Sequence, residues 1–150
     1  QNYIIYNYSI ISSIHSFLSH CANVSKMLKG KDESSPQKTI GDVLGIFETS
    51  DIHKRSFRNC LEHYDKELKK WIKHKGVNTT IGTYNIGSKN AFKIPNMVFV
   101  SHYDPTNNIF TFVNKDLDLE KLFIEVQKIK SIADVWVKNV ESKKIVPPFI

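Results

Sequence analysis

The chain has 150 residues, of which 41% are hydrophobic and 24% charged, and its formal net charge at pH 7 is +6. This length fits one domain with one core (residues 1–150), and the composition excludes a wholly disordered chain. No apolar run approaches the roughly 20 residues needed to cross a bilayer, so no membrane segment is predicted. The positive charge permits an anionic partner such as nucleic acid without requiring one.

The compartment is inferred from the first residues and from the cysteines. Residues 3–18 are rich in apolar side chains but are broken by Asn7, His15 and several serines, and no basic segment precedes them, so a signal peptide is not expected. Cys21 and Cys60 lie in no CxxC pair and cannot form a disulfide framework. We expect both to be buried thiols in a reducing compartment, which predicts a cytoplasmic protein.

The first half of the chain predicts three helices. An apolar stripe at helical spacing predicts the first, over residues 3–29, and Gly30 is placed to end it. After a polar loop, Thr39 is placed to cap a short helix over residues 40–47, although Gly41 and Gly45 weaken it. The third helix is predicted over residues 52–73. The stripe of the first helix is Ile11, Ile14, Leu18, Cys21, Ala22, Ser25 and Leu28, and that of the third is Phe57, Leu61, Tyr64, Leu68, Trp71 and Ile72.

The second half predicts a loop, a hairpin and a last helix. Residues 77–96 are rich in Asn, Thr, Gly and Ser, which predicts a long loop with a short extended piece at 80–86. Two β-branched and aromatic runs flank DPTNN and predict a hairpin of 97–103 with 109–113. A helix is predicted over 118–140, and the prolines keep the tail, 145–150, out of a helix. The fold expected is mainly α, an up-down helical bundle with one attached β-hairpin near residues 97–113.

The third helix carries the most informative polar residues. Residues 51–75 hold twice as many basic as acidic side chains. With Phe57 facing the core, a rotation of about 100° per residue puts Asn59 and His63 roughly 200° and 240° away, on the opposite face. Arg58 can reach Glu62 one turn further on. Geometry alone favours a plainer explanation, a solvated helix surface with one weak ion pair between Arg58 and Glu62.

Arg58-Asn59-Cys60-Leu61-Glu62-His63 resembles the R-x4-6-H signature of HEPN domains. The longer stretch RNCLEHYDKELKKW is similar to a sequence found in a poorly characterised prokaryotic HEPN-like group. The resemblance implies a small helical bundle that forms a homodimer with two motif helices across a cleft. It also implies a metal-independent endoribonuclease, often in a toxin-antitoxin pair, with Arg58, Asn59 and His63 catalytic.

The residue types suit this chemistry. A histidine that titrates near neutral pH can move the proton of a 2′-hydroxyl, and an arginine can hold the phosphate. Glu62 is predicted to hold Arg58 in place. Lys66, Lys69, Lys70 and Lys73 either guide the RNA backbone or form a solvated helix end.

Two alternatives to the nuclease remain open. The chain is otherwise a non-catalytic HEPN module that binds RNA, a nucleotide or a partner protein such as an antitoxin, or a structural dimer module whose motif only packs. The remaining histidines form no zinc-type cluster with cysteines or carboxylates, so no metal and no cofactor is predicted. Cys60 faces away from His63 on the predicted helix, which argues against a thiol nucleophile.

Overall fold

The computed structural model describes residues 2–29, 36–46, 50–53, 63–74, 80–91, 94–113 and 115–142. The chain divides into two compact units. Unit 1 comprises Gln1–His20 and Lys54–Glu120, and unit 2 comprises Cys21–His53 and Lys121–Ile150. Each unit is therefore assembled from two separate stretches of sequence.

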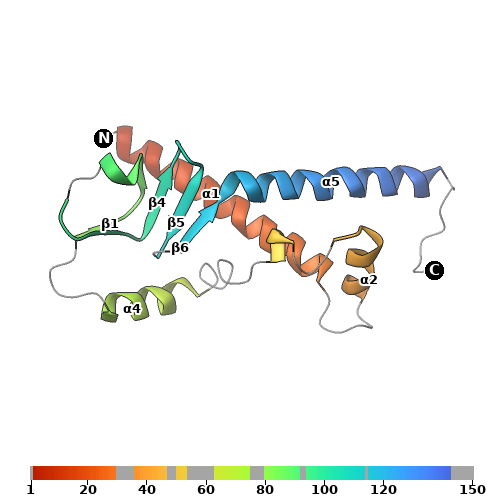
Figure 1. The fold of residues 1–150 in the computed structure, drawn as a ribbon, viewed down its shortest axis with the longest axis horizontal. Coiled ribbons are helices and arrows are strands. Elements are labelled where there is room, and N and C mark those ends of the chain that lie inside the picture. The colour runs from red at the N-terminus through yellow and green to blue at the C-terminus, as the bar shows by residue number, and fades with distance from the viewer. Residues whose placement is uncertain are drawn as a thin grey trace. The chain divides into compact units, whose positions relative to one another are not determined.

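The described elements combine helices with two small sheets (Figure 1). The helices are α1 (Asn2–Leu28), α2 (Pro36–Val43), α4 (Tyr64–His74) and α5 (Leu119–Glu141), with 3-10 turns η1 (Asp51–His53) and η2 (Lys89–Ala91). The strands are β1 (Thr80–Gly82), β2 (Asn85–Ile86), β3 (Met97–Phe99), β4 (Ser101–Asp104), β5 (Ile109–Phe112) and β6 (Lys115–Asp118). One sheet is β1-β3 and the other has the order β2-β4-β5-β6.

This mixed α/β architecture shows that the predicted mainly-α, HEPN-like up-down bundle is wrong. The hairpin is present, but it is the centre of a four-stranded sheet rather than an attachment to a bundle. The physical reason is the length and composition of the other strands. They span two to four residues each, too few to show a period of two, and β6 reads KDLD, which has no β-forming composition.

Two of these short strands are parts of one parallel ribbon. Thr80 pairs with Met97 and Asn85 pairs with His102, so both pairs are separated by 17 residues (97−80 and 102−85). The ribbon is interrupted at Tyr84, whose φ of 55° lies in the left-handed region. A bulky side chain is rarely held there, and such a conformation costs roughly 1–3 kcal/mol. The extended piece predicted at 80–86 within the loop over 77–96 is thus confirmed, and the described part of that loop also contains the 3-10 turn η2.

The hairpin is where the turn residues predicted it. β4 and β5 are antiparallel, with Asp104 paired to Ile109 across the loop. The Asp104 carboxylate accepts a hydrogen bond from the Thr106 N–H at 3.0 Å, and Asn108 adopts a φ of 53° that asparagine tolerates. The first predicted strand is split, however, because 97–99 pair with β1 instead.

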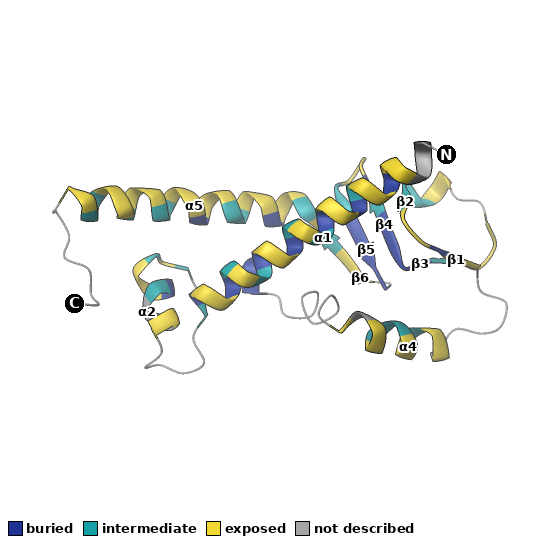
Figure 2. Ribbon diagram, turned by 180° about the vertical axis from the view of Figure 1, so that it is seen from behind, coloured by how far each residue is buried: buried dark blue, intermediate teal, exposed yellow. Residues whose placement is uncertain are grey.

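The core of unit 1 lies between the first half of α1 and the four-stranded sheet. Ile11 on α1 and Phe110 and Phe112 on β5 have no exposed surface. The ring of His15 meets both phenylalanines edge-on, with centroids 5.5 Å apart in each case. Figure 2 shows β4 and β5 as the most completely buried strands, against the buried stripe of α1. The predicted core stripe of the first helix is confirmed, with Ala22 half-buried.

The core of unit 2 joins the end of α1 to α2, η1 and α5. Leu28, Ile52 and Ile129 form its buried centre. Gly41 is required where α2 crosses α1, because a Cβ there would lie 2.4 Å from the Leu28 carbonyl oxygen. Gly45, at φ 65°, ends α2 in a Schellman motif, in which the Ile46 N–H reaches the Gly41 carbonyl at 2.8 Å. α2 begins at Pro36 rather than at residue 40, so Thr39, predicted to cap the short helix, lies inside it instead. The two glycines that weakened the prediction fix where α2 packs and where it ends.

The last predicted helix is confirmed as α5, whereas the third is not continuous. Residues 51–53 form a 3-10 turn, His63 lies in a turn, and α4 begins only at Tyr64. Phe123 and Val137 of α5 are about half exposed, at 50% and 46%. The predicted tail and Gly30 lie outside the described residues.

Candidate nucleic-acid interface

The predicted catalytic motif is only partly within the described structure. Arg58, Asn59 and Glu62, together with Cys60, lie outside the described residues. His63 is exposed and directly precedes α4, where its carbonyl accepts the Glu67 N–H at 3.0 Å. His63 therefore occupies the N-cap position of α4, at the end of the helix and not within it.

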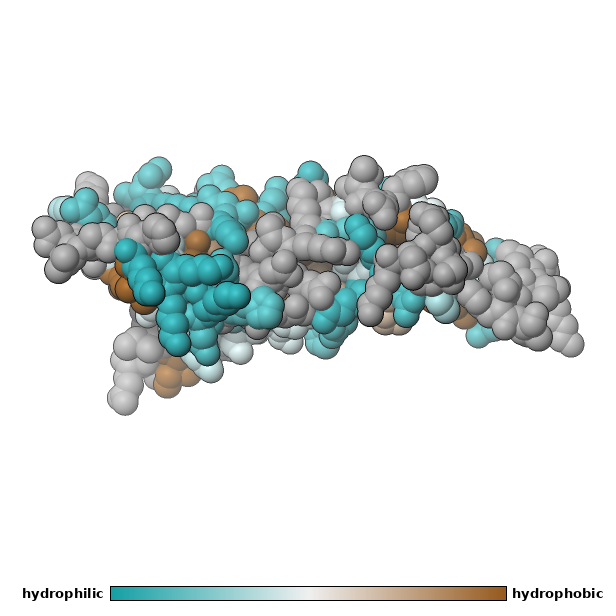
Figure 3. Space-filling view, turned by 90° about the horizontal axis from the view of Figure 1, so that it is seen from below, coloured by the Kyte–Doolittle hydropathy of each residue, from teal (hydrophilic) through white to brown (hydrophobic). Residues whose placement is uncertain are grey.

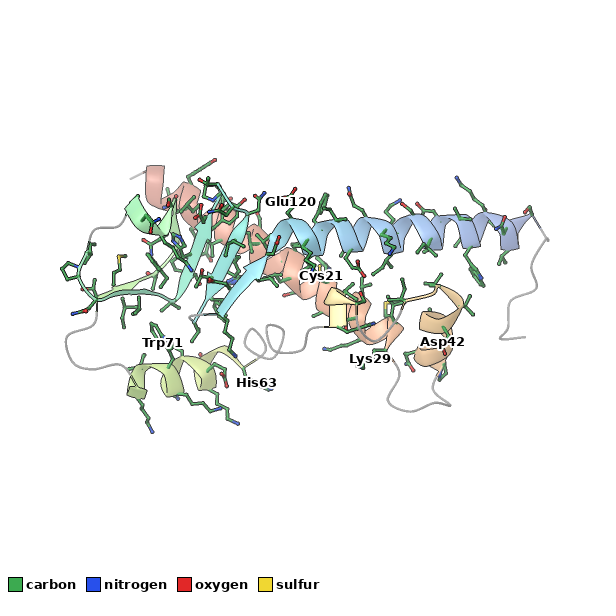
Figure 4. The ribbon with its side chains drawn as sticks, in the orientation of Figure 1. Cys21, Lys29, Asp42, His63, Trp71 and Glu120 are labelled. Atoms are coloured by element: carbon green, nitrogen blue, oxygen red, sulfur yellow. The ribbon has the colours of Figure 1, made fainter. Side chains whose placement is uncertain are left out.

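Four lysines of α4 share one exposed side of the helix. Lys66, Lys69, Lys70 and Lys73 are all exposed, and their spacing of three and four residues keeps them within about 60° of Lys66 around the axis. We call these four residues the lysine stripe. In Figure 3 hydrophilic side chains gather over α4, and in Figure 4 long side chains project from α4 away from the strands.

The stripe is only lightly neutralised. Lys70 donates to Glu67 at 3.1 Å, and Lys115 lies 3.9 Å from the same carboxylate. The hydrogen bond from Lys70 lowers the pKa of Glu67, so this carboxylate stays ionised. Within the part of the chain that the structure describes, Lys69 and Lys73 have no ion-pair partner. At least two ammonium groups are thus available to an external anion.

The opposite side of α4 carries the apolar residues, but less deeply than predicted. Leu68 and Trp71 are half-buried, and Figure 4 shows Trp71 on the side of α4 turned toward the strands. Ile72 is 47% exposed, so its predicted core position is wrong. The side chain of Tyr64 lies outside the described set.

The sequence that follows Glu67 is free of carboxylates over a long stretch, although Asp65 and Glu67 themselves flank Lys66. Between Glu67 and Asp104 there is no Asp or Glu, while Lys69, Lys70, Lys73, Lys75, Lys89 and Lys93 all fall in this interval. Residues 2–28, the whole of α1, also contain no acidic side chain. The positive charge of the chain is therefore segregated along the sequence of unit 1, which favours a polyanionic partner.

A buried hydrogen bond that sequence reasoning missed fixes the chain just before the motif. Ser25 on α1 and His53 on η1 lie 2.9 Å apart through Oγ and Nδ1, and both are under 10% exposed. Ser50 donates to Glu125 of α5 at 2.5 Å, and its carbonyl accepts the His53 N–H. The serine–histidine pair is enclosed, so no substrate reaches it, and its effect is to anchor residues 50–53 in unit 2.

A row of polar side chains crosses one face of the four-stranded sheet and was also missed. The pairing register aligns Asn85, His102, Thr111 and Asp116. Thr111 donates to Asp116 at 2.5 Å, and Lys89 of η2 contacts the same carboxylate at 2.8 Å. Burial would raise the pKa of Asp116, but the hydrogen bonds from Lys89 and Thr111 lower it overall.

The centre of this row is closed to ligands. His102 and Thr111 are 0% and 2% exposed, and the ring of Phe99 lies 4.2 Å from that of His102. Burial, and then the charge of Lys89, lower the pKa of His102. The contacts of Asp116 hold η2 against the sheet through Lys89 and add a side-chain hydrogen bond between β5 and β6 through Thr111. Only the register of four strands reveals it, so no local sequence signal could have found it.

His15 predicts a pH dependence of stability. Its Nε2 is enclosed and has no hydrogen-bond partner among the described residues, and burial lowers its pKa from the usual 6.5. Below pH 6.5 the unfolded chain therefore binds the proton more readily than the folded one. The free energy of unfolding decreases as the pH is lowered, until the pH drops below the lowered pKa of the folded state. We expect His15→Phe to flatten this fall, since it removes the titrating group and keeps a ring between the two phenylalanines.

Urea unfolding at about pH 7.5 and about pH 5.5 measures this effect. The difference in unfolding free energy between the two conditions should be smaller in His15→Phe than in the native protein. His20→Gln, an exposed position on the same helix, is the control and should behave like the native chain. An unchanged difference in His15→Phe would show that His15 is not enclosed.

Neither a metal site nor a membrane-spanning helix is found among the described residues. No group of three or more His, Cys, Asp or Glu side chains there is arranged to hold a metal ion. Of the helices described, none combines the length and apolar character that crossing a membrane requires. Cys21 is buried, which raises the pKa of its thiol to about 11 and leaves it unreactive at neutral pH.

Comparison with known proteins adds no relative to this description. Neither a family model, nor a curated protein, nor a solved structure matches the chain. The exposed lysine stripe, which begins three residues after the histidine of the predicted motif, therefore has to be interpreted on its own chemistry.

Proposed function

We propose that this protein binds single-stranded RNA, with the lysine stripe of α4 contacting the phosphate backbone. The observation that carries the proposal is the stripe itself: four exposed lysines on one side of one helix, of which only Lys70 is ion-paired within that helix. Phosphate contacts by lysine supply most of the affinity in sequence-independent binding.

A second candidate function is cleavage of the bound RNA. The observation that favours it is His63, which is exposed at the N-terminal end of α4, three residues before Lys66. With Arg58 holding the phosphate and His63 moving the proton of the 2′-hydroxyl, cleavage would need no metal. Asn59 and Glu62 would orient these two groups. A homodimer that brings two such motifs together, an antitoxin partner and a cytoplasmic location belong to this second proposal.

One experiment tests both proposals. The native protein is incubated in EDTA with a fluorescently labelled single-stranded RNA, binding is followed by anisotropy, and the RNA is then run on a denaturing gel. Binding that weakens steeply with salt while the RNA stays intact supports the binding function alone. Cleavage that is lost in His63→Ala and in Arg58→Ala supports the nuclease. Absence of any salt-sensitive binding would refute the main proposal.

A further inference from the structure

Two exposed aromatic rings lie in contact on the surface of unit 1. Tyr8 on α1 is 57% exposed, and Tyr84, between β1 and β2, is 43% exposed. Their ring centroids lie 5.4 Å apart with an interplanar angle of 58°. Large side chains this exposed usually occur singly on a protein surface, so a pair in mutual contact indicates a binding surface.

The backbone at Tyr84 is held in a conformation that glycine adopts more easily. Its φ of 55° is left-handed, although Gly82 and Gly87 lie only two and three residues away. At the interruption of the parallel ribbon a glycine would satisfy the backbone without strain. A strained residue that keeps a large exposed ring is a feature expected of a functional site.

The surroundings of the pair suit a nucleic acid. α1 has no acidic residue, and residues 80–91 contain Lys89 and no Asp or Glu. No carboxylate in these segments would repel a phosphate backbone. A nucleobase presents a π-face of any sequence to an aromatic ring, and such stacking is how sequence-tolerant proteins hold single strands.

We propose that Tyr8 and Tyr84 form a stacking platform for an unpaired base of the RNA, a role that rests on the proposed RNA-binding function. The geometry determines the mode of stacking. A base held between two rings needs both rings parallel to it, whereas these two are inclined at 58° with centroids only 5.4 Å apart. The base therefore stacks on the outer face of one ring, and the other ring supports it from behind.

The test compares two ligands and three variants. The ligands are an oligouridine of about 15 nucleotides and an abasic oligonucleotide of equal length, so that they share the backbone and differ in the bases. The variants are Tyr84→Gly, which removes the ring and relieves the backbone, Tyr84→Trp, which restores an aromatic face, and Tyr8→Ala. Affinity is measured by competition against labelled RNA, and urea unfolding of each variant establishes that it folds.

We expect the native protein to prefer oligouridine over the abasic strand by roughly 10-fold. Tyr84→Gly should lose this preference while its folding stability is unchanged or improved. Tyr84→Trp should retain the preference, and Tyr8→Ala should lose part of it.

Equal affinity of the native protein for both ligands would overturn the platform and leave the lysine stripe as the RNA contact. Binding of neither ligand would overturn the proposed function and the platform together. Concentration-dependent self-association that Tyr84→Gly abolishes, with no base preference, would assign the pair to a contact between copies of the chain and also overturn the platform.

Discussion

Phe110→Ala is expected to lower the free energy of unfolding by about 3–5 kcal/mol. Phe110 has no exposed surface, packs beside Phe112 with centroids 6.2 Å apart, and faces His15 of α1. Its loss leaves a cavity in the contact between α1 and the sheet, which the short strands cannot close by moving. Domains of this size have a total stability of about 5–15 kcal/mol, so unit 1 would be severely weakened.

Urea unfolding followed by circular dichroism measures this loss. The matched control is Phe123→Ala, because Phe123 is 50% exposed on α5 and its removal should cost less than about 1 kcal/mol. Tryptophan fluorescence helps to show which unit has unfolded, since Trp71 lies in unit 1 and Trp136 in unit 2. If Phe110→Ala cost no more than Phe123→Ala, the core described for unit 1 would be incorrect.

Neutralising the lysine stripe is expected to produce the largest effect on binding. Three phosphate contacts on a single strand give a slope of about −2 in log affinity against log salt. Between 1 M and physiological salt of about 0.15 M this slope corresponds to roughly 50-fold in affinity. The variant Lys66→Gln, Lys69→Gln, Lys73→Gln should therefore bind RNA roughly 50-fold more weakly at 0.15 M salt, and Lys70 stays paired with Glu67.

The control for this variant changes the same amount of charge elsewhere. Lys128, Lys130 and Lys138 are exposed on α5, and their replacement by glutamine lowers the net charge equally. If binding depended only on the net charge of the chain, both triple variants would lose the same affinity. A loss confined to the α4 variant assigns the contact to the stripe.

The long helices and the hairpin could be predicted because their signals are local. The apolar stripe from Ile11 to Leu28 repeats at helical spacing over about five turns, and DPTNN supplies both the turn and its capping carboxylate. The lysine stripe is local too, since its members lie within two turns of one helix. These features needed no knowledge of distant partners.

The sheets could not be predicted, because their evidence is spread over the chain. The extended piece at 80–86 was predictable, but its parallel pairing appears only through the shared offset of 17 residues from β3 and β4. The row from Asn85 to Asp116 exists only once four strands are in register, and the Ser25–His53 bond joins residues 28 apart. The mainly-α prediction failed for the same reason, since parallel pairing of two or three residues leaves no periodic trace.

The salt dependence of RNA binding tests the central claim most directly. The dissociation constant of the native protein for single-stranded RNA is measured in EDTA over a series of salt concentrations, beside the triple variant of Lys66, Lys69 and Lys73. We predict that the slope of log affinity against log salt is smaller in magnitude by about 2 in the variant. Identical slopes in the two proteins would contradict the assignment of the RNA backbone to α4.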